Sequence, residues 1–126
     1  VNHMFTKLYG LPHISVADVA RLRQSGDAEI FDCNPHRVWA KHHVPGARNI
    51  DPADYTTADL PIEVDRTLIF YCSDPMCGAG PHAARRARRF GYRNVLVMSD
   101  GIRSWLNAQL ETEPRLAQSL DSLAAR

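Results

Sequence analysis

Hydrophobic positions along the chain recur with two periods, which predict strands alternating with helices. Short apolar runs rich in β-branched and aromatic residues predict strands over 28–33, 47–50, 67–72 and 94–98. Apolar residues at helical spacing predict helices between Ser15 and Gly26, over 37–41, between Pro81 and Gly91, and over 102–110. Strands that alternate with helices are typical of an α/β fold, with a central parallel sheet and helices on both of its faces.

The ends of two predicted helices carry specific signals. Ser15, with Asp18 three positions later, is typical of an N-terminal cap, and Gly26 is typical of a C-terminal stop. Pro81 suits the first turn of the later helix, and Gly91 suits the position just after its end. The segment 51–61 is polar and bounded by prolines, so we expect a loop that holds at most one helical turn.

The chain is organised as one domain with short segments at both ends. We expect the domain to span 11–113, after a lead over 1–10 whose first residues resemble a cloning remnant before a natural Met4. A C-terminal tail over 114–126 repeats Leu116, Leu120 and Leu123 at helical spacing, which predicts a terminal helix. We expect this helix to pack on the domain or in a small oligomer contact, so the protein is a monomer or a small homo-oligomer.

Composition narrows the class of protein. The 126 residues suffice for one domain with its own core, and the net charge of +1 indicates neither nucleic acid nor a membrane surface as a partner. No apolar run is long enough to cross a bilayer, and no secretory leader is evident. The 3 cysteines are too few for a disulfide framework, so a reducing, cytoplasmic setting is expected.

The sequence around Cys72 is the strongest candidate for chemistry. The apolar run 67–72 ends at this cysteine, a loop of small and turn-forming residues follows, and a helix then begins. Unpaired N–H groups and the positive end of a helix dipole would lie near the thiol. Both favour the thiolate, so the pKa of Cys72 should fall; the alternative is a buried, inert cysteine that closes a core strand.

Several segments, taken in order, resemble a single-domain rhodanese, which is a sulfurtransferase. They are FDCN at 31–34, Trp39, HVPGA at 43–47, NI at 49–50, FYC at 70–72, GYRNV at 91–95 and DGIRSW at 100–105. The resemblance covers the chain from about Leu11 to Glu113 and implies a small doubly wound α/β domain, with Cys72 as the catalytic cysteine after the central strand. The loop that would wrap the sulfur comprises Ser73, Asp74, Pro75, Met76, Gly78, Ala79 and Gly80.

The resemblance also implies a reaction in two halves. The Cys72 thiolate would take the outer sulfur of a donor as a persulfide and pass it to an acceptor thiol, including a protein thiol. Loop N–H groups would hold the anionic sulfur. No metal and no organic cofactor is implied.

The loop departs from the family pattern in its charge. It is longer than usual, contains no lysine or arginine, and carries Asp74 as its only charge. A dianionic donor such as thiosulfate should therefore bind poorly, with Arg85 or Arg86 at best reaching in. Many members of the family have Asp-x-Arg near their second strand, whereas this chain has Asp32-Cys33-Asn34. Asp32 is therefore a candidate supporting residue. Arg37 is a second candidate, because it could substitute for the missing arginine.

A second loop thiol, Cys77, leaves three interpretations open. It has no catalytic role, it resolves an oxidised or persulfidated Cys72 as a disulfide, or it is itself the nucleophile. We expect Cys72 to be the more acidic of the two thiols.

The spacing of Cys72, Cys77 and His82 also allows a zinc site, but this spacing is looser than in structural zinc patterns. His82 is more simply a first-turn helix residue near the loop.

Two functions remain open from the sequence. The first is a sulfurtransferase, and the second is a non-catalytic or redox-sensing rhodanese-like module that binds a protein partner. A phosphatase that uses Cys-x5-Arg is disfavoured, because Gly78 and Ala83 stand where the two possible frames need arginine.

Overall fold

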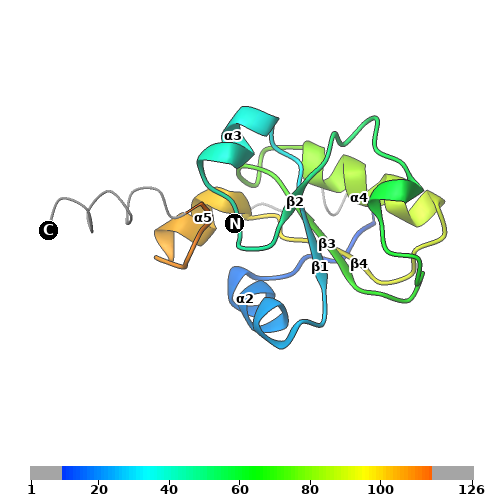
Figure 1. The fold of residues 1–126 in the computed structure, drawn as a ribbon, viewed down its shortest axis with the longest axis horizontal. Helices are drawn as coiled ribbons and strands as arrows, with labels where there is room; N and C mark the ends of the chain where they lie inside the picture. The colour runs from blue at the N-terminus through cyan, green and yellow to red at the C-terminus, as the bar shows by residue number, and fades with distance from the viewer. Residues whose placement is uncertain (1–9, 115–126) are drawn as a thin grey trace, which may run out of the picture.

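A computed structural model describes residues 10–114 and shows a parallel α/β domain (Figure 1). Its elements are α2 (Val16–Ser25), β1 (Glu29–Asp32), α3 (His36–Lys41), β2 (Arg48–Asn49), the 3-10 turn η1 (Thr57–Asp59), β3 (Leu68–Tyr71), α4 (Ala79–Arg89), β4 (Val95–Val97) and α5 (Gly101–Asn107). The four strands pair in parallel in the order β2-β1-β3-β4. The predicted fold class is therefore confirmed.

The order of the strands locates the crevice where such folds bind ligands. From β1 the chain adds β2 on one side and then returns to add β3 and β4 on the other. The winding direction therefore reverses between β1 and β3, and ligands of open α/β sheets bind outside the carboxyl ends of the strands at this point. Cys33 follows β1 and Cys72 follows β3, so two of the three cysteines lie at the reversal.

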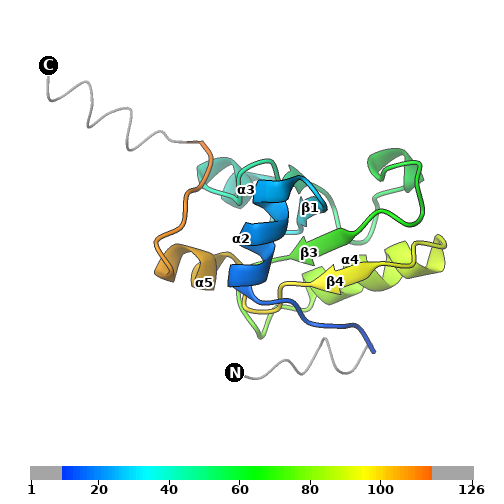
Figure 2. The ribbon, with the colours of Figure 1, turned by 90° about the horizontal axis from the view of Figure 1, so that it is seen from below.

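Helices cover both faces of the sheet. Helix α4 packs on β3 and β4 from one side, while α2 and α5 contact each other on the opposite side (Figures 1 and 2). Strand β3 is central, and all four of its residues are buried. Successive residues of β3 therefore point alternately toward α4 and toward the α2–α5 layer.

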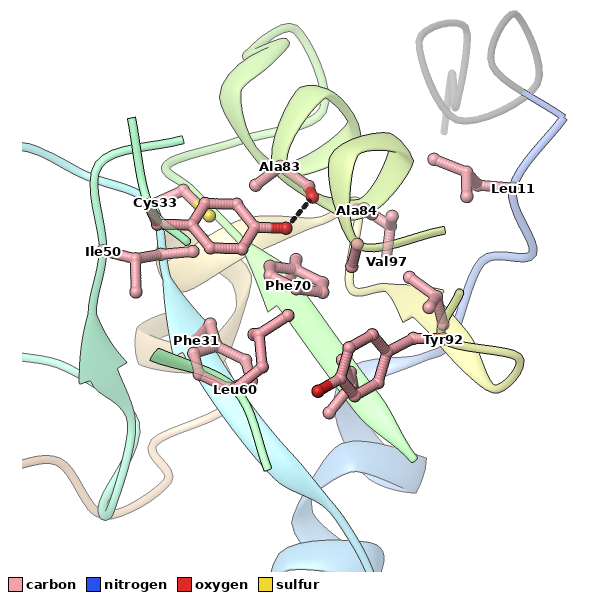
Figure 3. Close-up of a cluster of buried hydrophobic side chains, with 14 of the residues drawn as sticks. Leu11, Phe31, Cys33, Ile50, Leu60, Phe70, Ala83, Ala84, Tyr92 and Val97 are labelled. Atoms are coloured by element: carbon pink, nitrogen blue, oxygen red, sulfur yellow. Dashed lines mark hydrogen bonds between the residues drawn. The ribbon is translucent and has the colours of Figure 1, made fainter. Parts of the chain in front are cut away.

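Small residues on α4 allow a close approach to the sheet. Ala83, Ala84 and Ala87 are completely buried on this face. Beneath them the rings of Phe31 and Phe70 stack with centroids 5.1 Å apart (Figure 3). The Tyr55 hydroxyl donates a 2.6 Å hydrogen bond to the carbonyl oxygen of Ala83, the dashed line in Figure 3, and so ties the loop before β3 to α4.

The opposite face contains a buried polar network. The Tyr71 hydroxyl donates to Asp32 Oδ2 at 2.7 Å and accepts from the Val44 N–H at 3.0 Å. Asp32 Oδ1 accepts from the Asn34 N–H at 2.7 Å, so both carboxylate oxygens are satisfied. Burial raises the pKa of Asp32 and that of Tyr71. These bonds connect β1, β3 and the segment after α3.

Two helices have boundaries different from those predicted. Helix α4 begins at Ala79, not at Pro81, because Gly78 already has helical angles of φ −90° and ψ −4°. Pro81 remains in the first turn, where its missing N–H costs nothing. Ala79 and Gly80 therefore belong to the helix rather than to the loop. Helix α5 ends at Asn107 rather than at residue 110, and Gln109 leaves the helical region with φ 59°.

The expected caps of α2 are confirmed, whereas the two terminal segments are not part of the described structure. Ser15 caps α2 by accepting from the Asp18 N–H at 3.1 Å, and Gly26 ends that helix with φ 74°. Between residues 10 and 114, no helix combines the length and apolar character needed to cross a membrane. The predicted tail helix lies outside the described residues, as does nearly all of the N-terminal lead.

Candidate active site

The Cys72 thiol lies at the carboxyl end of β3, enclosed by the loop that leads into α4. Only 4% of the residue is exposed. The Gly80 N–H, in the first turn of α4, donates to Cys72 Sγ at 3.4 Å. The thiol in turn donates to the carbonyl oxygen of Cys77 at 3.5 Å. The Cys72 sulfur therefore accepts one hydrogen bond from an N–H group and donates one to a carbonyl oxygen.

Cys77 lies on the outer side of the same loop and is half-buried. Its sulfur interacts with the Cys72 thiol, with the N–H groups of Ala79 and Ser73, and with the Ser73 hydroxyl. The hydrogen bond from Cys72 contributes most, and together these donors lower the pKa of Cys77 to about 5. Cys77 is therefore the more acidic of the two loop thiols.

The acidity of the two thiols is thus the reverse of the sequence expectation. The pKa of Cys72 is raised, first because its thiol donates to Cys77 and second because it is buried. The single N–H from Gly80 opposes this shift without reversing it. Cys72 lacks the exposure and the several donors that Cys77 has, so a negative charge is stabilised more at the outer sulfur than at the inner one.

The first turn of α5 positions the start of the loop. The Ile102 N–H donates to the carbonyl oxygen of Cys72 at 2.9 Å, and the Arg103 N–H donates to that of Ser73 at 3.1 Å. Gly101, with φ 73°, makes this approach possible, because a Cβ there would lie 2.4 Å from the Ser73 carbonyl carbon and oxygen. The Asp100-Gly101 dipeptide at the start of α5 was the sequence signal for this contact, and the interpretation of the loop missed it.

The charge of Asp74 is paired with Arg103, an arginine that the sequence did not connect with the loop. Asp74 Oδ1 accepts from the Met76 N–H at 2.9 Å and so shapes the tip of the loop. Asp74 Oδ2 lies 3.5 Å from Nη2 of Arg103, which comes from α5. The fold therefore supplies the cation that the loop itself lacks.

Comparison with known proteins agrees with this arrangement. The family model for the rhodanese-like domain matches residues 15–108. The chain belongs to the rhodanese-like domain family. The thiol enclosed after the central strand of this rhodanese-like domain is the feature that the sequence resemblance assigned to Cys72.

Two curated relatives differ in what surrounds the matching domain. An HTH-type transcriptional regulator of Mycobacterium tuberculosis is 33% identical over 100 residues, which cover 79% of this chain and 44% of the regulator. The human thiosulfate:glutathione sulfurtransferase is 29% identical over 114 residues, which cover 79% of this chain and 97% of the enzyme. This chain therefore spans less than half of the regulator and nearly all of the human enzyme.

A solved structure supports the same family. The human single-domain sulfurtransferase superposes with a TM-score of 0.66 at 25% identity, covering 76% of this chain and 96% of that one. These relatives indicate a sulfurtransferase family, although one matching protein is named as a transcriptional regulator.

The other predicted site residues lie on the opposite face of the sheet or on the surfaces of helices. Asp32 takes part in the buried network on the α2–α5 face, because it pairs in register with Tyr71 rather than with Cys72. Arg37 lies exposed on α3, while His82 and Arg85 lie exposed on α4. Arg86 donates from Nε to the Tyr55 carbonyl oxygen at 2.8 Å, so its guanidinium packs against that loop.

The remaining loop residues surround the thiols without adding charge. Met76 is an exposed hydrophobic residue at the tip of the loop, and Pro75 and Gly78 are half-buried. Across residues 10–114 the structure assembles no group of three histidine, cysteine or carboxylate side chains that could hold a metal ion. The zinc interpretation of Cys72, Cys77 and His82 therefore has no geometric support in this part of the chain.

A third thiol lies beside the loop. Cys33 is buried, and its N–H donates to the Tyr71 carbonyl oxygen at 2.8 Å, which places it next to Cys72 across the two strands. Burial raises its pKa well above the ordinary value. Cys33 also lines a hollow of about 480 Å³, together with Asn49, Ile50 and Ala79. This hollow opens at the same edge of the sheet as the thiol loop.

Proposed function

We propose that this rhodanese-like domain is a sulfurtransferase that carries sulfane sulfur as a persulfide on Cys72. The observation that carries the proposal is the position of the Cys72 sulfur after β3, where it faces the N–H of Gly80 at 3.4 Å. Once it is bound to Cys72, the terminal persulfide sulfur can ionise, and the N–H groups at the start of α4 would stabilise the anion. The acceptor is a small thiol or a protein thiol.

The first half-reaction loads Cys72. As Cys72 Sγ attacks the outer sulfur of an organic persulfide R–S–SH, its proton passes to the Cys77 thiolate. The bond between the two donor sulfurs breaks, and the electron pair leaves with R–S⁻. Cys77 is the group positioned to take the proton, because a thiol with a lowered pKa is ionised at neutral pH and because its sulfur already interacts with the Cys72 thiol.

The second half-reaction unloads the domain. An acceptor thiolate attacks the terminal sulfur of the Cys72 persulfide, the S–S bond breaks, and the Cys72 thiolate leaves and recovers the proton from Cys77. No net oxidation occurs, since one sulfur atom moves between two thiols. The human relative, named as a thiosulfate:glutathione sulfurtransferase, supports this class of reaction.

A second function is favoured by a different observation. The thiol loop pairs a buried thiol with a half-exposed one, and the M. tuberculosis relative, 44% of which is covered by the match, is named as a transcriptional regulator. A redox-sensing module that reports to a protein partner through a Cys72–Cys77 disulfide would use the same two residues.

Intact mass after exposure to a sulfur donor distinguishes these functions. For the sulfurtransferase we expect the wild-type chain to gain one sulfur atom from glutathione persulfide and to lose it when thiol is added. Cys72→Ser should abolish this gain, whereas Cys77→Ser should slow loading but permit it. Full loading of Cys72→Ser and none of Cys77→Ser would assign the persulfide to Cys77. No gain in the wild type would favour the redox module.

A further inference from the structure

We propose that the Arg103 guanidinium receives the negatively charged group of the sulfur donor, so that the preferred donors are organic persulfides with one anionic group. This inference rests on the proposed sulfur transfer and specifies its substrate class. It places the determinant of specificity on α5, outside the loop between β3 and α4.

Arg103 has separate tasks for its backbone and its side chain. Its N–H binds the Ser73 carbonyl oxygen at 3.1 Å, which holds the residue at the edge of the thiol loop. Its side chain is 70% exposed and reaches Asp74, two residues after Cys72. A change of the side chain alone therefore leaves the backbone contact in place, and any effect on the reaction comes from the guanidinium.

The ion pair with Asp74 is weak enough to exchange. The distance is 3.5 Å and the guanidinium is largely in solvent, where such pairs contribute little free energy. A carboxylate or sulfonate on the donor would therefore compete with Asp74 for the same guanidinium, and a planar guanidinium binds either group through paired N–H donors.

The charges around the loop favour one negative group over two. Asp74 offsets much of the Arg103 charge, and the Cys77 thiolate adds a negative charge on the same loop. A dianion whose charge lies close to the reacting sulfur meets this thiolate at short range. A donor with its single charge several bonds from the sulfur reaches Arg103 while keeping that charge away from Cys77.

Two donors that differ only in charge test the inference. They are 2-carboxyethyl persulfide and 2-aminoethyl persulfide, and the measurement is the second-order rate constant for loading Cys72, followed by rapid quench and mass spectrometry. Arg103→Gln should lower the rate with the carboxylate donor by about tenfold and leave the ammonium donor unchanged or faster. Arg103→Lys should restore part of the loss.

Asp74→Asn supplies the second arm. It should raise the rate with the carboxylate donor by about threefold, and this gain should disappear in the Arg103→Gln background because Asp74 acts through Arg103. Asp65 and Arg93 form a matched control, since they make a 3.6 Å pair with exposures of 74% and 73% at the other end of the sheet. Asp65→Asn and Arg93→Gln should change neither rate.

The outcomes separate the two proposals. If Arg103→Gln slows both donors alike or slows neither, the inference is wrong while sulfur transfer stands. If Asp74→Asn accelerates the carboxylate donor equally with and without Arg103, the Asp74 carboxylate repels the donor directly and the inference is also wrong. If the wild type is loaded by neither donor, the proposed sulfur transfer fails, and the inference fails with it.

Discussion

The Cys72 thiol donates a hydrogen bond to the carbonyl oxygen of Cys77 at 3.5 Å, and this contact links the buried sulfur to the half-exposed one. The Cys77 sulfur interacts with donors from Ser73 and Ala79, and these contacts help to lower its pKa. The pair thus combines a protected position for a sulfur atom with a neighbouring thiolate that can take a proton.

Cys77 should react with electrophiles at a lower pH than Cys72 does. Because the pKa of Cys77 is lowered to about 5, labelling by iodoacetamide should be half-maximal near that pH, with Cys72 still unlabelled. Peptide mapping across a pH series measures both rates. Cys72→Ala should raise the pKa of Cys77, since it removes the largest stabilising contact. Labelling of Cys72 first would contradict this order.

Mild peroxide should convert the two thiols into a disulfide. The Cys77 thiolate would be oxidised to a sulfenic acid, which the Cys72 thiol attacks with release of water. Peptide mapping should find Cys72 linked to Cys77, and dithiothreitol should reverse the link and restore sulfur loading. Unlinked cysteines with Cys77 as sulfinic acid would show instead that the loop holds the sulfurs apart.

Gly101→Ala should impair loading of Cys72 more than it impairs folding. The added Cβ would lie 2.4 Å from the Ser73 carbonyl, so the start of the thiol loop must shift. Gly26→Ala is the matched control, because Gly26 has φ 74° against 73° at Gly101 but has nothing within 4 Å of the added Cβ. Both variants should lose about 1 kcal/mol or more from backbone strain. Equal loading by the two variants would contradict a positioning role for Gly101.

Tyr71→Phe should destabilise the fold without changing the chemistry of the thiols. It leaves the Val44 N–H and one Asp32 oxygen without their partner, at a cost of about 1–3 kcal/mol in the free energy of unfolding. Urea denaturation measures this loss. Tyr55→Phe, which removes a single hydroxyl bond to Ala83, should cost less.

The loss caused by Tyr71→Phe should also depend on pH. Burial raises the pKa of Asp32 in the folded protein. The contribution of the protonated carboxyl to the free energy of unfolding is therefore present at low pH, and it is lost as the pH rises through the pKa of the folded state. The Tyr71 hydroxyl lowers that pKa by stabilising the charged form. Its removal should therefore destabilise the protein more at about pH 7 than at about pH 4. A loss independent of pH would mean that Asp32 stays protonated throughout this range.

The helices, the strands and the place of Cys72 after a buried strand could be predicted from the order of residues along the chain. Periodicity is local, so runs such as that ending at Cys72 predicted the strands, and the caps at Ser15 and Gly26 predicted the limits of α2. The start of α4 was predicted two residues late, because Pro81 marks a first turn without fixing which position of that turn it occupies.

Only the tertiary structure decided the electrostatics of the site. The order of acidity of Cys72 and Cys77 depends on burial and on which N–H groups converge, and the sequence gives the donors without their directions. Arg103 reaches Asp74 because Gly101 lets α5 contact the loop after β3. Charges and hydrogen bonds act through space, so residues distant along the chain set the pKa values and the charge of the site. The sequence predicts where the site lies, but not these contacts.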